Sequence, residues 1–339
     1  MKKIYLLVSV FTIIFTSCDT DFDVNAEWEE VTVVYGLLDA GDDNKTQLIK
    51  INKAFLGKMD ALQMAKYADS INFNPNDLDV NIYRIKNGSV IDSVVLDTTI
   101  IIKDSLANNG DPGVFSIDNN IIYTFENDNF LKSDSEYELL IKNNLTGNEV
   151  SSVTNIISAF NFDMGASFPF GFIDTWIPGT PSATEFSNTS VRWGNSTDNG
   201  VQYQIDLIFN YQDSLDNVID RSLIYSTSVL EGTSQFEFEG EKFFNFLKLS
   251  IDKDITGQLK RKFLSIDLVM TVGSEDLRTY RIINEEITGI VQERPQFTNI
   301  NNGIGLFSSR YTKVRYGFPL TSSSIDFLKS IDGLDRNFQ

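Results

Sequence analysis

The chain has 339 residues, of which 42% are hydrophobic and 12% aromatic, so it is long enough to bury two cores. Lys and Arg total 28 against 47 Asp and Glu, and the resulting net charge of −19 excludes nucleic acid as a partner because it repels a polyanion. With no histidine and one cysteine, the sequence also excludes internal disulfides, Cys/His zinc sites, Ser-His-Asp triads and Cys-His dyads.

The first residues have the layout of a secretory signal peptide. Two lysines precede an apolar run from Ile4 to Phe15, which is too short to span a bilayer at about 1.5 Å per residue. The only cysteine, Cys18, follows this run behind small residues and resembles a bacterial lipobox cysteine. We therefore predict a signal peptide over residues 1–17 and lipidation of Cys18, the alternative being an ordinary signal peptide with a chance cysteine.

An acidic cluster of Asp19, Asp21 and Asp23 follows the predicted lipid anchor. It resembles the export signal that sends Bacteroidota lipoproteins to the outer face of the outer membrane. The alternative is a solvated acidic tether that no receptor reads. We expect a tether over residues 18–28, attachment to the membrane through lipid, and a location on the outer membrane facing the cell exterior.

Most of the remaining chain alternates apolar and polar residues with a period of two, which is typical of half-buried strands. The clearest runs are Val201 to Gln212 and Leu264 to Val272. The other predicted strands are Val31 to Leu38, Thr46 to Ala54, Leu78 to Ile82, Val90 to Leu96, Ile121 to Phe125, Tyr137 to Ile141, Glu149 to Ile157, Leu223 to Val229 and Arg278 to Asn284.

Helical patterns are few, and they fall at Asp60 to Ser70, Glu241 to Ile251 and Ser323 to Leu328. A segment over residues 159–183 is rich in Pro, Gly and aromatic residues and poor in alternation, so we place the domain boundary there. The predicted fold is mainly β, with two β-sandwich-like or open-barrel domains and a few short helices. The N-terminal β-sandwich covers residues 29–158 and the C-terminal β-rich domain covers residues 184–339.

The aromatic residues in and after this segment admit two interpretations. Their rings pack between the two domains, or they form a surface for a ligand or partner, with the tryptophans as a stacking platform for sugars. The candidates for that surface are Phe168, Phe170, Phe172, Trp176 and Trp193.

Candidate catalytic groups are restricted to carboxylates, lysine, tyrosine and serine. Glu237, Glu239 and Glu241 alternate along a strand-like run, but like charges in a row more often protect a solvated sheet edge. A carboxylate-based hydrolase is therefore a minor alternative, and we assign neither catalytic residues nor a cofactor. An acidic turn with Asp39, Asp42 and Asp43 is a weak calcium candidate, and an ordinary turn is the simpler interpretation.

Five Asp-(Ser/Thr)-(aliphatic or Thr) triplets match the pattern for O-glycosylation of exported Bacteroidota proteins. Composition alone gives about two by chance. The hydroxyls at Ser70, Ser93, Thr98, Ser105 and Ser214 are candidates only where they are exposed.

Three segments carry a resemblance to a known family: Val33 to Asp39, Ile49 to Gly57 and Gln292 to Arg310. With the lipobox before them, they resemble the Bacteroidota surface lipoproteins gathered under domain of unknown function 4249. The resemblance implies an outer-membrane lipoprotein with β-rich domains and no established enzyme activity. It offers no catalytic residues to transfer.

The sequence thus favours a non-enzymatic lipoprotein that acts as an accessory or interaction subunit beside an outer-membrane barrel in transport, assembly or secretion. The alternative is a free-standing surface module that binds a glycan or another ligand.

Overall fold

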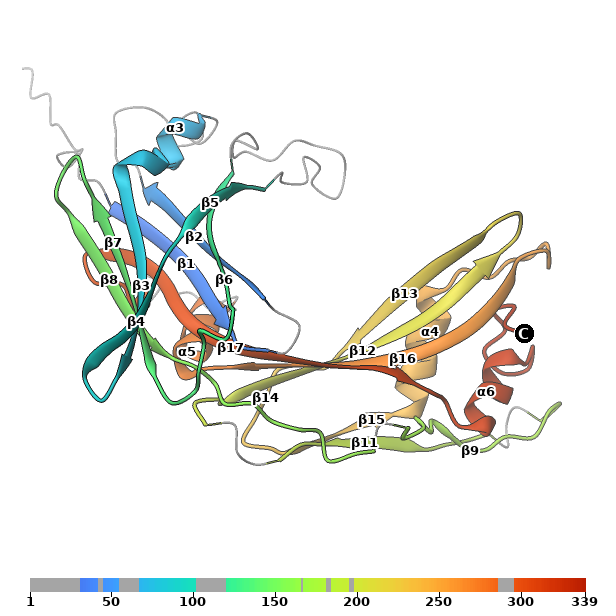
Figure 1. The fold of residues 1–339 in the computed structure, drawn as a ribbon. Coiled ribbons are helices and arrows are strands. Elements are labelled where there is room, and N and C mark those ends of the chain that lie inside the picture. The colour runs from blue at the N-terminus through green and yellow to red at the C-terminus, as the bar shows by residue number, and fades with distance from the viewer. Residues whose placement is uncertain are drawn as a thin grey trace, which may run out of the picture.

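The computed structural model describes residues 31–41, 45–54, 67–101, 120–165, 167–180, 184–194, 198–285 and 296–339. Within these residues the chain is mainly β with few helices, as its alternation predicts. It forms two lobes joined by one long sheet (Figure 1). Two separate hydrophobic cores lie in the two lobes.

The N-terminal lobe is a β-sandwich whose two layers bury alternating apolar residues such as Val34, Ile49 and Ile82 between them. Its elements are β1 (Val31–Asp39), β2 (Thr46–Ala54), α3 (Ala68–Ile71), the 3-10 helix η1 (Pro75–Asp77), β3 (Leu78–Lys86), β4 (Ser89–Val95), β5 (Asp97–Ile100), β6 (Ile121–Glu126), β7 (Glu136–Asn143) and β8 (Glu149–Asn155). One layer is the four-stranded sheet β4-β3-β7-β8, and the other contains β1, β2, β6 and β5.

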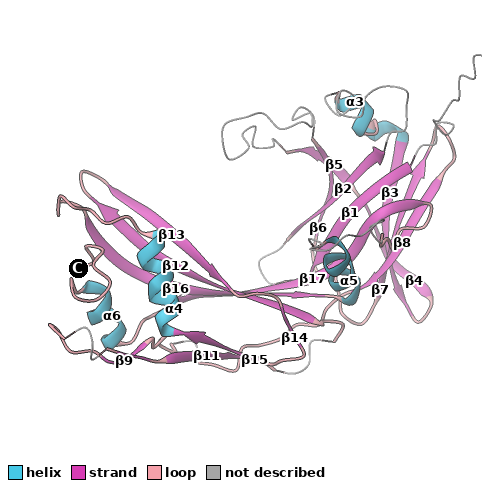
Figure 2. Ribbon diagram, turned by 180° about the vertical axis from the view of Figure 1, so that it is seen from behind, coloured by secondary structure: helices cyan, strands magenta, loops and turns pink. Residues whose placement is uncertain are grey.

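The C-terminal lobe packs helices and a small hairpin against one face of its long strands (Figure 2). Its elements are β9 (Ile173–Thr175), β10 (Glu185–Phe186), β11 (Asn188–Arg192), β12 (Gln202–Ser214), β13 (Val218–Ser226), β14 (Leu230–Glu231), β15 (Gln235–Glu239), α4 (Gly240–Ser250), β16 (Lys260–Gly273), α5 (Glu275–Asn284), β17 (Gly303–Phe318) and α6 (Ser322–Lys329). Helices α4 and α6 and the β11–β15 pair contribute side chains to this core.

Strand β17 belongs to both lobes. The order of the long sheet is β13-β12-β16-β17-β1-β2-β6-β5, with β14 also paired to β12. From Gly303 to Arg310, β17 runs parallel to β1, and from Arg310 to Phe318 it runs antiparallel to β16. Because Ile300 and Phe307 lie in the N-terminal core, the C-terminal end of the chain completes the N-terminal sandwich. The predicted boundary over residues 159–183 therefore does not divide the chain into two lobes that are separate in space, because β17 belongs to both.

The segment expected between the domains is part of the C-terminal core. The two cores meet in sequence at Ile156 and Ile157, and Phe160, Phe162 and Phe172 all belong to the C-terminal one. Phe172 stacks on Phe243 of α4 with ring centroids 4.2 Å apart. A stretch with little alternation is thus held by ring packing against a helix together with the short strand β9 and isolated bridges.

One predicted strand is wrong. Two of the three predicted helices are confirmed, and the third is described only in part. Arg278 to Asn284 is not a strand but most of helix α5, which begins after Ser274 with Glu275 and Asp276 in its first turn. The helices predicted at Glu241 and Ser323 are confirmed as α4 and α6. Of the helix predicted from Asp60, α3 is the described part, since residues 55–66 lie outside the described ranges.

No helix within the described residues is long and apolar enough to cross a membrane.

Candidate functional site

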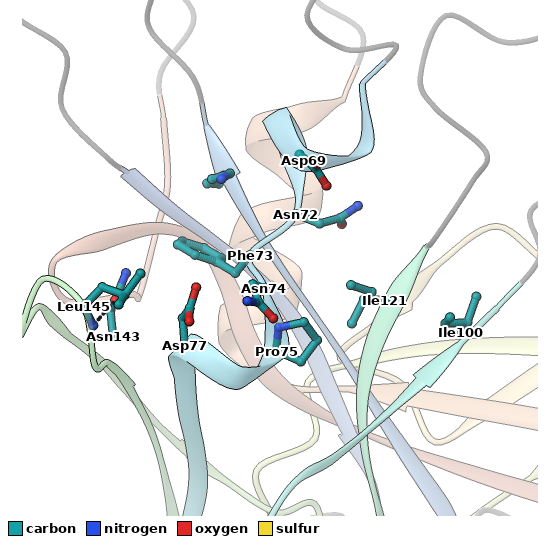
Figure 3. Close-up of a pocket in the computed structure, with 11 residues that line it drawn as sticks. Asp69, Asn72, Phe73, Asn74, Pro75, Asp77, Ile100, Ile121, Asn143 and Leu145 are labelled. Carbon is teal, nitrogen blue, oxygen red and sulfur yellow. Dashed lines mark hydrogen bonds between the residues drawn. The ribbon is translucent and has the colours of Figure 1, made fainter.

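A polar pocket of about 380 Å³ opens at one end of the N-terminal sandwich, beside α3 and the end of β2 (Figure 3). It lies where the two layers of the sandwich diverge, and both layers contribute to its walls. The lining residues are Lys53, Asp69, Asn72, Phe73, Asn74, Pro75, Asp77, Ile100, Ile121, Asn143 and Leu145.

The apolar lining of the pocket is Phe73, Pro75, Ile100, Ile121 and Leu145. The ring of Phe73 is largely buried in the N-terminal core. The ammonium of Lys53 stands 5.8 Å from the centroid of this ring, which is within the range of a cation–π contact. Asn74 follows and caps η1, because its side chain accepts a hydrogen bond from the Asn76 amide at 3.2 Å. Local turn chemistry thus fixes the backbone directly after the ring.

A network centred on Lys50 and Asn72 supports the wall beside α3. Lys50 Nζ donates to Asn72 Oδ1 at 3.3 Å, to Asn120 Oδ1 at 2.7 Å and to the carbonyl of Ile121 at 2.9 Å. Asn52 Nδ2 donates to the carbonyl of Ile71 at 2.7 Å and to Asn72 Oδ1 at 3.1 Å. These bonds hold Asn72, a pocket residue, between β2 and β6, so the wall is built before a ligand arrives.

Two carboxylates, Asp69 and Asp77, and one ammonium, Lys53, give the pocket its charges. Near it, burial and, to a smaller extent, the Asp77 carboxylate together raise the pKa of Tyr123 to about 12. The Tyr123 hydroxyl is buried and has no hydrogen-bond partner in the part of the chain that the structure describes. The pocket combines amide and charged groups with five apolar side chains, which suits a ligand that has both polar and apolar parts.

Within the described ranges, no cluster of three or more Asp, Glu, His or Cys side chains is arranged to hold a metal ion. The weak calcium candidate Asp39 is buried and is occupied by protein donors. Its Oδ1 accepts from the amides of Gly41 and Thr312, and its Oδ2 accepts from Arg310 Nε and Thr312 Oγ1, all within 3.0 Å. Asp42 and Asp43 lie outside the described residues.

The predicted aromatic surface is wrong for most of its members. Phe170 and Phe172 are fully buried and Trp193 is 3% exposed, so these rings pack in the C-terminal core and offer no platform to a sugar. Trp176 is half-buried against Phe327. Phe168 remains exposed and lines a second hollow of about 420 Å³ on the C-terminal lobe, together with Met164 and Arg192.

The remaining predicted sites are placed as follows. Ser93 and Thr98 are exposed on β4 and β5, and Ser214 is half-buried at the end of β12. Ser70 lies in α3, where its side chain is not described. Outside the described residues lie Ser105, the lipidation site Cys18 and the export signal Asp19, Asp21 and Asp23.

The segments that carry the family resemblance come together in the structure. Val33 to Asp39 lies in β1, Ile49 to Ala54 in β2, and Gly303 to Arg310 in β17, and these three strands are neighbours in the long sheet. The shared pattern therefore describes the centre of the N-terminal sandwich. Of the pocket residues it includes only Lys53.

Sequence reasoning missed the pocket itself. Its signal was the run from Asn72 to Asp77, in which amides flank an aromatic residue and a proline directly before a strand. Such a run also reads as an ordinary turn, and the structure alone shows that it lines a hollow.

Comparison with protein-family models gives no match, and a search of the curated proteins gives none either.

Proposed function

We propose that this chain is a non-enzymatic lipoprotein of the outer membrane that acts as an interaction subunit beside an outer-membrane barrel complex in transport, assembly or secretion. The predicted anchor at Cys18, the acidic export signal and the resemblance to domain of unknown function 4249 lipoproteins support its location. The protein faces the cell exterior.

The position of the pocket relative to the anchor carries the proposal. The described chain enters the N-terminal lobe at Val31, which pairs with Ala54, and Lys53 of the pocket is the neighbour of Ala54. Residues 19–30 separate Val31 from the predicted anchor, and twelve residues span no more than about 40 Å. A partner that binds the pocket end of the lobe therefore resides in or near the membrane.

The test is co-purification of the tagged full-length lipoprotein from native membranes in mild detergent. We expect one barrel protein in near-stoichiometric yield. Leu145→Arg places a bulky cation on the pocket rim, where the side chain is 75% exposed, and we expect it to reduce that yield. Leu249→Arg is the matched control, since Leu249 is even more exposed but lies on α4 of the other lobe.

A protein that is recovered alone, and whose deletion leaves membrane complexes unchanged, contradicts the proposal. Equal loss of the partner in both variants contradicts the assignment of the pocket end.

A free-standing ligand-binding module is the second candidate, and the pocket favours it because amides and carboxylates line it beside a ring. In that case the purified protein binds a small polar ligand, such as a glycan, without any membrane partner. A glycan screen with wild type and Leu145→Arg separates the two functions.

A further inference from the structure

The N-terminal sandwich has one closed side and one open side. On the closed side Ser151 and Asn301 form a bridge that joins β8 to the residues before β17, with N···O distances of 3.3 and 2.8 Å. On the open side β4 ends one layer and β5 ends the other. These two strands are consecutive in the chain, so within the part of the chain that the structure describes residues 89–101 supply the outer edges of both layers on this side.

This edge exposes apolar side chains, and its only charged protection is the pair of carboxylates Asp92 and Asp97. Five of its apolar side chains are exposed, with Val95 at 71% and Ile100 at 61%. The exposed apolar residues are Val90, Ile91, Val95, Ile100 and Ile101. Lysine and proline normally guard an exposed edge strand, and residues 89–101 contain neither. Such an edge is a template for pairing with a further strand.

Charge selects the kind of strand that fits. The edge carries two exposed carboxylates, Asp92 and Asp97, and no cationic residue. A second copy of the chain would bring the same two carboxylates and the same net charge of −19, which opposes self-pairing. A strand that alternates apolar and basic residues complements both the exposed side chains and the carboxylates.

We propose that the β4–β5 edge receives a β-strand donated by a different protein, in which apolar residues alternate with lysine or arginine. Backbone hydrogen bonds to the free edge supply affinity, and side-chain complementarity supplies the choice of partner. The inference rests on the proposed function, because it names a surface and a partner chemistry for an interaction subunit. The edge shares only Ile100 with the pocket, and the variants that test the two assignments change other residues.

The probes are two labelled peptides of about nine residues, one alternating valine with lysine and one alternating valine with glutamate. Fluorescence anisotropy measures their binding to the detergent-solubilised full-length protein. We expect the basic peptide to bind at least about tenfold more tightly than the acidic one. We also expect it to slow amide hydrogen exchange in residues 89–101.

The edge variant is Ile91→Lys with Val95→Lys, which leaves the pocket residues unchanged. Its matched control is Val218→Lys with Ile224→Lys, since these exposed residues lie on β13, the free edge of the other lobe. Both double variants change the net charge equally, so general attraction of a basic peptide to an acidic protein affects them alike. We expect the edge variant to weaken the basic peptide about tenfold or more relative to the control.

Several outcomes overturn the inference: no binding of the basic peptide, equal loss in both double variants, or protection from exchange outside residues 89–101. Sedimentation that shows a dimer, lost in the edge variant, assigns the edge to a second copy instead. If the edge variant still co-purifies a barrel protein but no longer binds the peptide, the barrel docks elsewhere. If the peptide binds at the edge and no barrel co-purifies, the proposed function fails while the edge assignment stands.

Discussion

Asp39 holds the point at which β17 passes from one lobe to the other. Its carboxylate is nearly inaccessible and accepts four hydrogen bonds, two of them from Thr312. In Asp39→Asn an amide NH₂ group replaces one acceptor and faces donors, and the attraction to Arg310 is lost. Because Arg310 is partly solvated, we expect a loss of about 2–3 kcal/mol in the free energy of unfolding, measured by urea titration.

The control for this prediction is Asp134→Asn. Asp134 also meets two cations, Arg84 and Lys86, but its side chain is 53% exposed, so water screens both pairs. We expect a much smaller shift of the urea midpoint than for Asp39→Asn. Equal shifts of the urea midpoint would show that burial at the lobe junction does not determine how much the Asp39 contacts contribute to the free energy of unfolding.

Tyr123 gives a prediction of opposite sign. Its hydroxyl is buried without a hydrogen-bond partner among the described residues, so Tyr123→Phe removes an unsatisfied polar group and is expected to raise the free energy of unfolding by about 1 kcal/mol. A clear loss of stability would show instead that the hydroxyl is bonded.

The same residue predicts a pH effect. Its pKa is about 12 in the fold and 10.0 in the unfolded chain. As pH rises from 10 to 12 the unfolded chain therefore releases this proton first, and stability falls. Tyr123→Phe should flatten this fall, which urea titrations at pH 9, 10 and 11 measure.

At the scale of elements, Gly305 is the position in β17 where the chain approaches β1 most closely. Its φ is +118°, and a Cβ atom there would lie 2.0 Å from the carbonyl oxygen of Val34. Gly305→Ala must therefore displace one strand from the other, and we expect a loss of about 3 kcal/mol or more. Gly147→Ala is the control: φ there is +77° but the space is open, so about 1 kcal/mol is expected from strain alone. Similar losses for both variants would contradict a role for close packing.

Strand identity could be predicted where one face is buried and the other solvated. Strand β2 has the predicted bounds Thr46 to Ala54, and β12 shows the predicted alternation of buried residues. The sequence predicts a strand where α5 lies because no side chain of this helix is buried, so its apolar residues need not follow helical spacing. The Ser274-Glu275-Asp276 sequence was the signal that was available.

The pairing of β1 with β17 could not be predicted, because local periodicity carries no information about partners that are about 270 residues apart in the chain. The same limit applies to the candidate site. Lys53, Asp77, Ile121 and Asn143 come from separate segments, and only the sandwich brings them to one pocket. Conversely, the aromatic residues that did stand out in sequence are mostly core residues, because rings of this size gain most from burial.

At the scale of the whole molecule, the sharing of β17 makes the N-terminal lobe dependent on the end of the chain. A fragment of residues 19–158 lacks the strand beside β1 and the buried side chains of Ile300 and Phe307. Full burial of each such side chain contributes about 1.5–3 kcal/mol, a large part of the 5–15 kcal/mol typical of a domain.

We therefore expect this fragment to unfold at a much lower urea concentration than the same fragment fused through a flexible linker to residues 296–310. Far-UV circular dichroism measures both unfolding transitions. Adding Phe307→Ser to the fusion should remove most of the gain, because the strand then pairs without filling the core. If the fragment alone unfolds at the midpoint of the fusion, β17 only crosses the N-terminal sandwich and does not complete it.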